Sequence, residues 1–156
     1  MERKKLKDSL RNREKLFGAW VSYAEPSITE TFAKAGFDFL AIDMEHSTIT
    51  LPQAQRIIAA SQFYNVPCLP RPVSHSNDFF KPLLESGSDG LLVQMVNTTD
   101  EVEKIINYLN IHPLGKGVMV LIELKNMDLN LIITSQIGMM NLLLLFKLSQ
   151  LKLLII

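Results

Sequence analysis

Three side chains with different proton chemistry stand close together in the segment 36–46, which reads GFDFLAIDMEH. Two are the carboxylates Asp43 and Glu45, and the third is the imidazole of His46. They follow an apolar run of strand type at 39–42. The carboxyl end of a buried parallel strand is where an α/β protein usually builds a site. The alternative, which the sequence alone leaves open, is that these are solvated loop residues after a strand.

The segments that would position these side chains alternate between strand and helix. The predicted strands are 17–22, 39–43, 66–71 and 90–96. A predicted helix follows each strand. The first covers 26–34, the second is capped by Thr50 or Ser47, the third starts at Asn77 or Asp78, and the fourth is capped by Thr99. Leucines at near-helical spacing also predict an amphipathic helix within residues 2–15. Four strand–helix units indicate parallel strands joined by right-handed crossovers. They would make half of an eightfold (β/α) barrel, or most of a small open sheet.

Length and composition bound the class of protein. A chain of 156 residues suits one domain with a real core, and 47% apolar against 21% charged residues is typical of globular chains. Lys+Arg and Asp+Glu are both 16, so no global field would attract nucleic acid or an anionic membrane. The one cysteine, Cys68, allows no internal disulfide, and no apolar secretory segment follows Met1. We therefore expect a cytoplasmic protein.

Four segments resemble the HpcH/HpaI aldolase family, the metal-dependent class II pyruvate aldolases related to the citrate lyase β chain. Residues 36–46 resemble the family signature GFDxxxIDxEH. The sequence Gly18-Ala19-Trp20 resembles its first strand, Pro70-Arg71-Pro72 the arginine at the end of strand three, and His112 to Lys116 the start of its PPxGxRG loop. Gln94 departs from the proline that many members have there.

The resemblance, which covers about residues 5–116, implies an α/β fold, the N-terminal half of a (β/α)8 TIM barrel. It implies reversible aldol cleavage of a 2-keto or 2-keto-3-deoxy acid to pyruvate and an aldehyde, in a homo-oligomer. A divalent metal ion (Mg, Mn or Co) would hold the pyruvate enolate as a Lewis acid. The family's metal ligands, a glutamate in a VQIE motif on strand five and an aspartate on strand six, do not occur in this sequence. We expect them in a missing C-terminal half.

The resemblance also implies roles for individual residues. His46 matches the acid/base histidine, since an imidazole can take and return a proton at neutral pH. Asp43 would orient that ring and fix its tautomer. Arg71 matches the substrate arginine, because a guanidinium fork suits the keto acid's carboxylate and the developing enolate. Glu45 would support the metal or its waters without binding the metal directly.

Each role has a plainer alternative. His46 could be a capping or solvated histidine, Arg71 a surface ion-pair partner, and Glu45 a loop carboxylate. The remaining candidates, His75, His112 and Cys68, are expected to have structural roles only.

Residues 111–156 break the pattern, because periodicity disappears and Leu, Ile and Met dominate. The apolar run 138–146 is shorter than the roughly 20 residues of a membrane span. Our hypothesis is a change of reading frame near Lys116. If the third base of each codon is read together with the first two bases of the next codon, codons permitted for 139–156 can spell a string that contains VQIE. The tail would then be non-homologous to the family domain at 1–116.

Two consequences and two alternatives follow from this interpretation. A tail that does not fold on the half-barrel would leave the first and fourth strands with unpaired edges and an exposed apolar inner layer. The truncated chain would then be inactive as an aldolase. The alternatives are a lyase of the citrate-lyase-like group acting on an acyl-CoA, and a non-catalytic half-barrel that serves as a binding or assembly fragment.

Overall fold

The structure is a computed structural model that describes residues 3–12, 14–110, 119–124, 130–134, 143–146 and 151–154. Its elements in chain order are α1 (Arg3–Arg11), β1 (Leu16–Val21), α2 (Pro26–Ala35), β2 (Phe39–Asp43), α3 (Leu51–Phe63), β3 (Cys68–Arg71), α4 (Asn77–Glu85), β4 (Gly90–Val96), α5 (Thr99–Asn110), β5 (Met119–Leu124), β6 (Asn130–Thr134), β7 (Leu143–Phe146) and β8 (Leu151–Leu154). The four predicted strand–helix units are confirmed. The proposed boundary at residue 116 lies outside the described residues.

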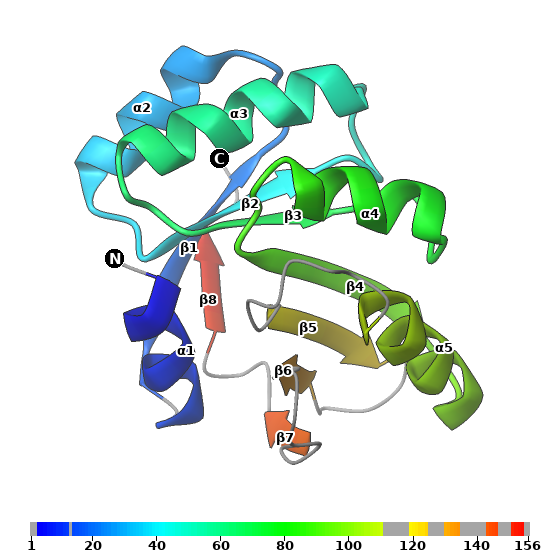
Figure 1. Cartoon of the computed structure of the whole chain (residues 1–156). Helices are drawn as coiled ribbons and strands as arrows, with labels where there is room; N and C mark the ends of the chain where they lie inside the picture. Colours follow the sequence, from blue (N-terminus) through cyan, green and yellow to red (C-terminus); the bar gives the residue numbers. More distant parts are fainter. Residues whose placement is uncertain are drawn as a thin grey trace.

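The strands form two sheets (Figure 1), with the orders β3-β2-β1-β8 and β4-β5-β6-β7. The first sheet is parallel throughout, and β4 and β5 are also parallel. β6 and β7 run antiparallel to their neighbours. The connection 125–129 is too short for a parallel crossover, which takes about a dozen residues, so β6 must run back along β5.

The expectation of unpaired edges is therefore wrong. β1 pairs with β8, where Leu16 lies opposite Leu151, and β4 pairs with β5, where Gly90 lies opposite Met119. Apolar tail segments supply extended backbone to both strands, because exposed strand edges offer unpaired N–H and C=O groups to any extended segment. β3 is an edge strand of the first sheet and β4 is an edge strand of the second. These two strands lie close to each other, although they belong to different sheets.

β2 is buried on both of its faces, as parallel strands usually are. Leu40 and Ile42 belong to the core between the sheet and the helices that follow each strand. Phe39 and Ala41 point the other way, into a second cluster with Leu6 and other residues of α1. Figure 1 shows α2 and α3 on one side of this sheet and α1 on the other. The inner layer at β2 is thus covered, contrary to expectation, because α1 packs on it.

Local signals set where the helices begin and end. Thr50 and Gln53 form a capping box at the start of α3, and Gly36 ends α2 with a left-handed φ of 85°. The cap of α5 is Thr98 and not the predicted Thr99: the hydroxyl of Thr98 accepts a hydrogen bond from the backbone N–H of Glu101. Glu101 in return accepts one from the N–H of Thr98. A reciprocal pair of this kind specifies the cap more strongly than a single threonine.

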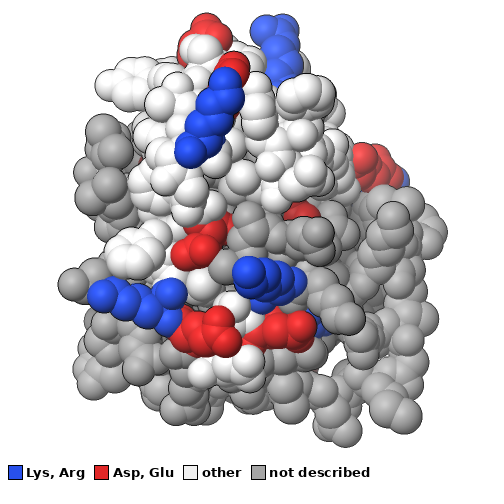
Figure 2. Space-filling model, turned by 90° about the vertical axis from the view of Figure 1, so that its left-hand side faces the viewer, with Lys and Arg blue, Asp and Glu red and all other residues white. Residues whose placement is uncertain are grey.

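Charged side chains of both signs are interspersed on the face drawn in Figure 2, where the described residues show no broad area of one sign. The overall balance of charge agrees with this, since basic and acidic residues are equal in number. None of the helices within the described ranges is long and apolar enough to span a membrane.

Candidate functional site

An ion pair between neighbouring strands forms the centre of the site. Asp43 ends β2, Arg71 ends β3, and the two residues lie opposite each other in the parallel register. The Nη2 atom of Arg71 lies 2.6 Å from Oδ2 of Asp43, and its Nε–H donates to Oδ1 at 3.1 Å. Both side chains are nearly buried, at 14% and 11% exposed. A bidentate pair of this kind has a fixed geometry, so it sets the orientation of the guanidinium.

The carboxylate of Asp43 also shapes the loop that follows it. Its Oδ1 atom accepts hydrogen bonds from the backbone N–H groups of Glu45, at 3.1 Å, and His46, at 2.9 Å. The hydroxyl of Ser47 donates to the main-chain oxygen of Asp43 and accepts from the N–H of Ile49 at 3.1 Å. The turn after β2 is therefore held by side chains within it, as is usual where Asp and Ser follow a strand.

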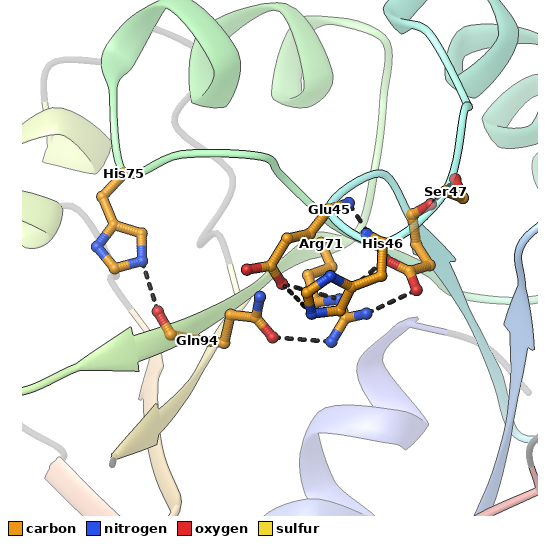
Figure 3. Close-up of polar contacts among 7 residues, drawn as sticks. Glu45, His46, Ser47, Arg71, His75 and Gln94 are labelled. Atoms are coloured by element: carbon orange, nitrogen blue, oxygen red, sulfur yellow. Dashed lines mark hydrogen bonds and ion pairs between the residues drawn. The ribbon is translucent and has the colours of Figure 1, made fainter.

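His46 and Arg71 meet through Glu45. The Oε2 atom of Glu45 lies 3.5 Å from Nε2 of His46 and 3.6 Å from Nε of Arg71. That oxygen is buried and has no hydrogen-bond partner. The side chain of His46 is 69% exposed, so its ring is open to a ligand from solvent. Figure 3 shows the side chains of Glu45, His46 and Arg71 turned toward one another at this end of the sheet.

The contacts of His46 differ from the prediction that Asp43 orients its ring. Asp43 binds the backbone N–H of His46, while the ring nitrogen faces Glu45. The reason is that Arg71 and the loop amides already engage both oxygens of Asp43. Asp43 thus positions the backbone of His46, and Glu45 is the described carboxylate that faces the imidazole of His46.

Three further residues contact this group, and sequence reasoning gave none of them a role in the site. The Oε1 atom of Gln94, near the end of β4, accepts from Nη1 of Arg71 at 2.8 Å. Nε2 of His75 lies 2.5 Å from the main-chain oxygen of Gln94. The guanidinium carbon of Arg71 lies 4.4 Å from the ring centroid of Trp20, a cation–π contact. The signal that could have found Gln94 is its place near the end of a predicted parallel strand, whereas Arg71 was singled out by the family resemblance.

The electrostatics of the pair favour the charged form of Asp43. Burial by itself raises the pKa of this carboxyl. The hydrogen bond from Arg71, the backbone N–H of His46 and the nearby positive charge outweigh burial and lower the pKa below its ordinary value. Asp43 is therefore an anion at neutral pH, which suits a hydrogen-bond acceptor that positions other groups.

The residues expected to be structural fall in three different places. Cys68 is fully buried in β3, and burial raises the pKa of its thiol to about 12, so it is not a thiolate at neutral pH. His75 contacts the main chain of Gln94, as described above. His112 lies outside the described residues.

The described residues do not make a metal site by themselves. Across the described part of the chain, no group of three or more His, Cys, Asp or Glu side chains could hold an ion. Both oxygens of Asp43 are taken by hydrogen bonds, which leaves Glu45 as the carboxylate with an unpartnered oxygen.

Comparison with known proteins identifies the family. A sequence model of the family described as HpcH/HpaI aldolase/citrate lyase matches residues 16–156. The chain therefore belongs to the HpcH/HpaI aldolase/citrate lyase family, and the resemblance predicted from its motifs is confirmed.

Two curated relatives and one solved structure show how far the similarity extends. The chain is 30% identical over 110 residues to a 2-keto-3-deoxy-L-rhamnonate aldolase of Salmonella typhi, covering 70% of this chain and 41% of that protein. It is 34% identical over 113 residues to a hydroxypyruvate/pyruvate aldolase of Cupriavidus necator, covering 72% and 42%. The crystal structure of an HpcH/HpaI aldolase from Desulfitobacterium hafniense superposes with a TM-score of 0.63 at 22% identity, covering 70% and 43%.

The chain thus spans about two fifths of the length of the curated relatives it matches. The solved structure shares the α/β fold with its parallel sheet.

Proposed function

We propose that the site belongs to a carbon–carbon lyase that cleaves a 2-keto acid to pyruvate and an aldehyde. The observation that carries this proposal is the meeting of His46, Asp43, Glu45 and Arg71 at the carboxyl ends of β2 and β3 in a chain of the aldolase family. The named relatives are aldolases, one for a 2-keto-3-deoxy acid and one for hydroxypyruvate and pyruvate. They support pyruvate as the keto acid product.

Arg71 is the proposed binding residue for the substrate's carboxylate. An arginine has five N–H donors. Contacts with described residues use the Nε–H, one N–H of Nη2 and one N–H of Nη1. One N–H on each terminal nitrogen is left over by this count, and such a pair matches the two oxygens of a carboxylate.

His46 is the proposed proton carrier. In aldol cleavage, the hydroxyl two carbons from the ketone loses its proton as the carbon–carbon bond breaks. The products are an aldehyde and the enolate of pyruvate, which then regains a proton on carbon. An exposed imidazole beside Glu45 can accept the first proton and return the second. Asp43 and Glu45 hold the histidine in place and act as positioning residues.

Several parts of this proposal go beyond the described residues. The divalent metal ion that the resemblance implies would need ligands from outside them. Residues 1–116 would be the N-terminal half of a (β/α)8 barrel, with residues 117–156 as a non-homologous tail. Assembly into a homo-oligomer and a cytoplasmic location remain predictions.

The proposal is tested by titrating pyruvate into the wild-type chain and into the variants Arg71→Lys and Arg71→Ala. Calorimetry measures the binding in each titration. We expect both variants to weaken binding by at least tenfold, since a hydrogen bond to a charged group contributes about 1.5–3 kcal/mol. Arg71→Lys should not rescue binding, because lysine keeps the charge and loses the fork. The proposal fails if the wild-type chain does not bind pyruvate, or if Arg71→Ala binds pyruvate as tightly as the wild-type chain does.

The same titration distinguishes the alternative of an acyl-CoA lyase. The family description joins aldolases with citrate lyase, which keeps this alternative open. An acyl-CoA ligand that binds through Arg71 when pyruvate does not would favour it. Binding of neither ligand would favour a non-catalytic fragment.

A further inference from the structure

We propose that Gln94 is a positioning residue that fixes the guanidinium of Arg71 for a carboxylate ligand, and that its neutral charge sets which ligands the site accepts. The identity of the ligand rests on the proposed function. The positioning itself rests only on contacts in the structure.

Three contacts from three strands hold the guanidinium. Asp43 of β2 binds the edge formed by Nε and Nη2. The ring of Trp20 on β1 lies against its face at 4.4 Å. Gln94 of β4 accepts from Nη1, the terminal nitrogen that Asp43 does not reach, at 2.8 Å. Without this third contact, Nη1 would have no acceptor among the described residues.

The backbone around Gln94 is built to aim its side chain. The register of β4 against β5 shifts between Val93 and Val96, which marks a bulge around Gln94 and Met95. Met95 has a left-handed φ of 58°, an uncommon backbone state for a residue other than glycine. His75 holds the main-chain oxygen of Gln94 at 2.5 Å. Bulges beside functional sites commonly redirect a side chain, and here the bulge directs Gln94 to Arg71.

Charge explains why a carboxamide suits this position. The positive charge of Arg71 already faces two carboxylates, those of Asp43 and Glu45. Gln94 adds an acceptor without adding a third negative charge. A glutamate at the same place would satisfy Nη1 equally well, but it would repel an anionic ligand at close range. The site therefore separates two tasks, positioning of the guanidinium and attraction of a carboxylate.

The experiment compares Gln94→Leu, Gln94→Glu and the wild-type chain by fluorescence and by pyruvate titration. Trp20 is the only tryptophan, and it lies against Arg71, so its emission reports on the guanidinium. Gln55→Leu, an exposed position on α3, is the matched control and should change neither readout. Circular dichroism confirms that each variant is folded.

We expect Gln94→Leu to shift the Trp20 emission and to weaken pyruvate binding by about tenfold, the effect of one lost charged hydrogen bond. Gln94→Glu should keep the wild-type emission, because the acceptor remains, and still bind pyruvate at least tenfold more weakly. If Gln94 had a purely structural role, Gln94→Glu would not weaken pyruvate binding while it leaves the Trp20 emission unchanged.

Unchanged emission in Gln94→Leu would overturn the positioning role, and wild-type affinity in Gln94→Glu would overturn the role of charge. If the wild-type chain does not bind pyruvate at all, the proposed function fails. The Trp20 emission of the two variants without any ligand then still decides whether Gln94 positions Arg71.

Discussion

Asp43 connects more of the site than any other described side chain. Its two oxygens accept from the guanidinium of Arg71 and from the backbone of Glu45 and His46. One carboxylate therefore couples the end of β2, the end of β3 and the turn that carries the imidazole. A change at this residue should therefore affect both Arg71, the proposed ligand-binding residue, and His46, the proposed proton carrier.

We predict that Asp43→Asn lowers the free energy of unfolding at pH 7 by about 3 kcal/mol, because it removes the nearer of the two carboxylates that face a nearly buried guanidinium. Urea unfolding measures this change in the free energy of unfolding.

The pH dependence of the stability of the wild-type chain has a defined sign. The pKa of Asp43 is lowered in the folded chain from an ordinary value of 3.8, so its ionisation stabilises the fold above that pH. This contribution is lost as pH falls from about 3.8 through the folded-state pKa.

The variant should therefore show a smaller loss of stability on acidification below pH 4 than the wild-type chain does. Asp78→Asn, at an exposed position in the first turn of α4, serves as the control for the loss of one carboxylate. Equal stability of Asp43→Asn and wild type at pH 7 would contradict the ion pair's importance.

At the scale of elements, the approach of β1 to β2 depends on a glycine. Gly18 lies opposite Phe39 in the parallel register. A Cβ atom added to Gly18 would overlap the aromatic ring of Phe39, which is fully buried beside α1. The two strands and α1 thus pack together because position 18 has no side chain.

We predict that Gly18→Ala destabilises the fold by about 1–3 kcal/mol, the usual cost of overpacking a core. Thermal unfolding followed by circular dichroism gives the measurement. Phe39→Leu should relieve the overlap, so the cost of Gly18→Ala should be smaller in that background. Additive effects of the two substitutions would show that the ring is not what limits position 18.

For the whole molecule, the central question is what the site within residues 36–94 can do in a chain that spans about two fifths of the length of its curated relatives. The described chain places an acid/base candidate, His46, and the proposed carboxylate-binding residue, Arg71, at one end of a parallel sheet. It spans 41% of the rhamnonate aldolase relative. The motif that the resemblance assigns to the metal, VQIE, does not occur in the sequence.

We predict that the purified chain, supplied with Mg²⁺, Mn²⁺ or Co²⁺, releases no pyruvate from a 2-keto-3-deoxy sugar acid. A coupled lactate dehydrogenase assay measures release. A chain carrying the shifted reading frame after Gly115 is the informative comparison, and we expect it to bind the metal more tightly than the present chain. Pyruvate release by the present chain would contradict the prediction, and resequencing of the locus tests the frame directly.

The sequence by itself determined the local structure and the family. Continuous apolar runs predicted β2 and β4 with their observed bounds, because burial on both faces of a strand selects such a run. Gly36 and Pro26 marked the ends of α2 through their backbone preferences. Family motifs identified Asp43, His46 and Arg71 as one group, which the structure brings together at one end of the sheet.

Only the tertiary structure decided how those side chains pair. Nothing in the local sequence placed Gln94 against Arg71, or Glu45 rather than Asp43 against the ring of His46. These contacts depend on the register between strands and on which oxygens are already taken by other donors. The pairing of β8 with β1 likewise came from an available strand edge and not from any pattern in the tail.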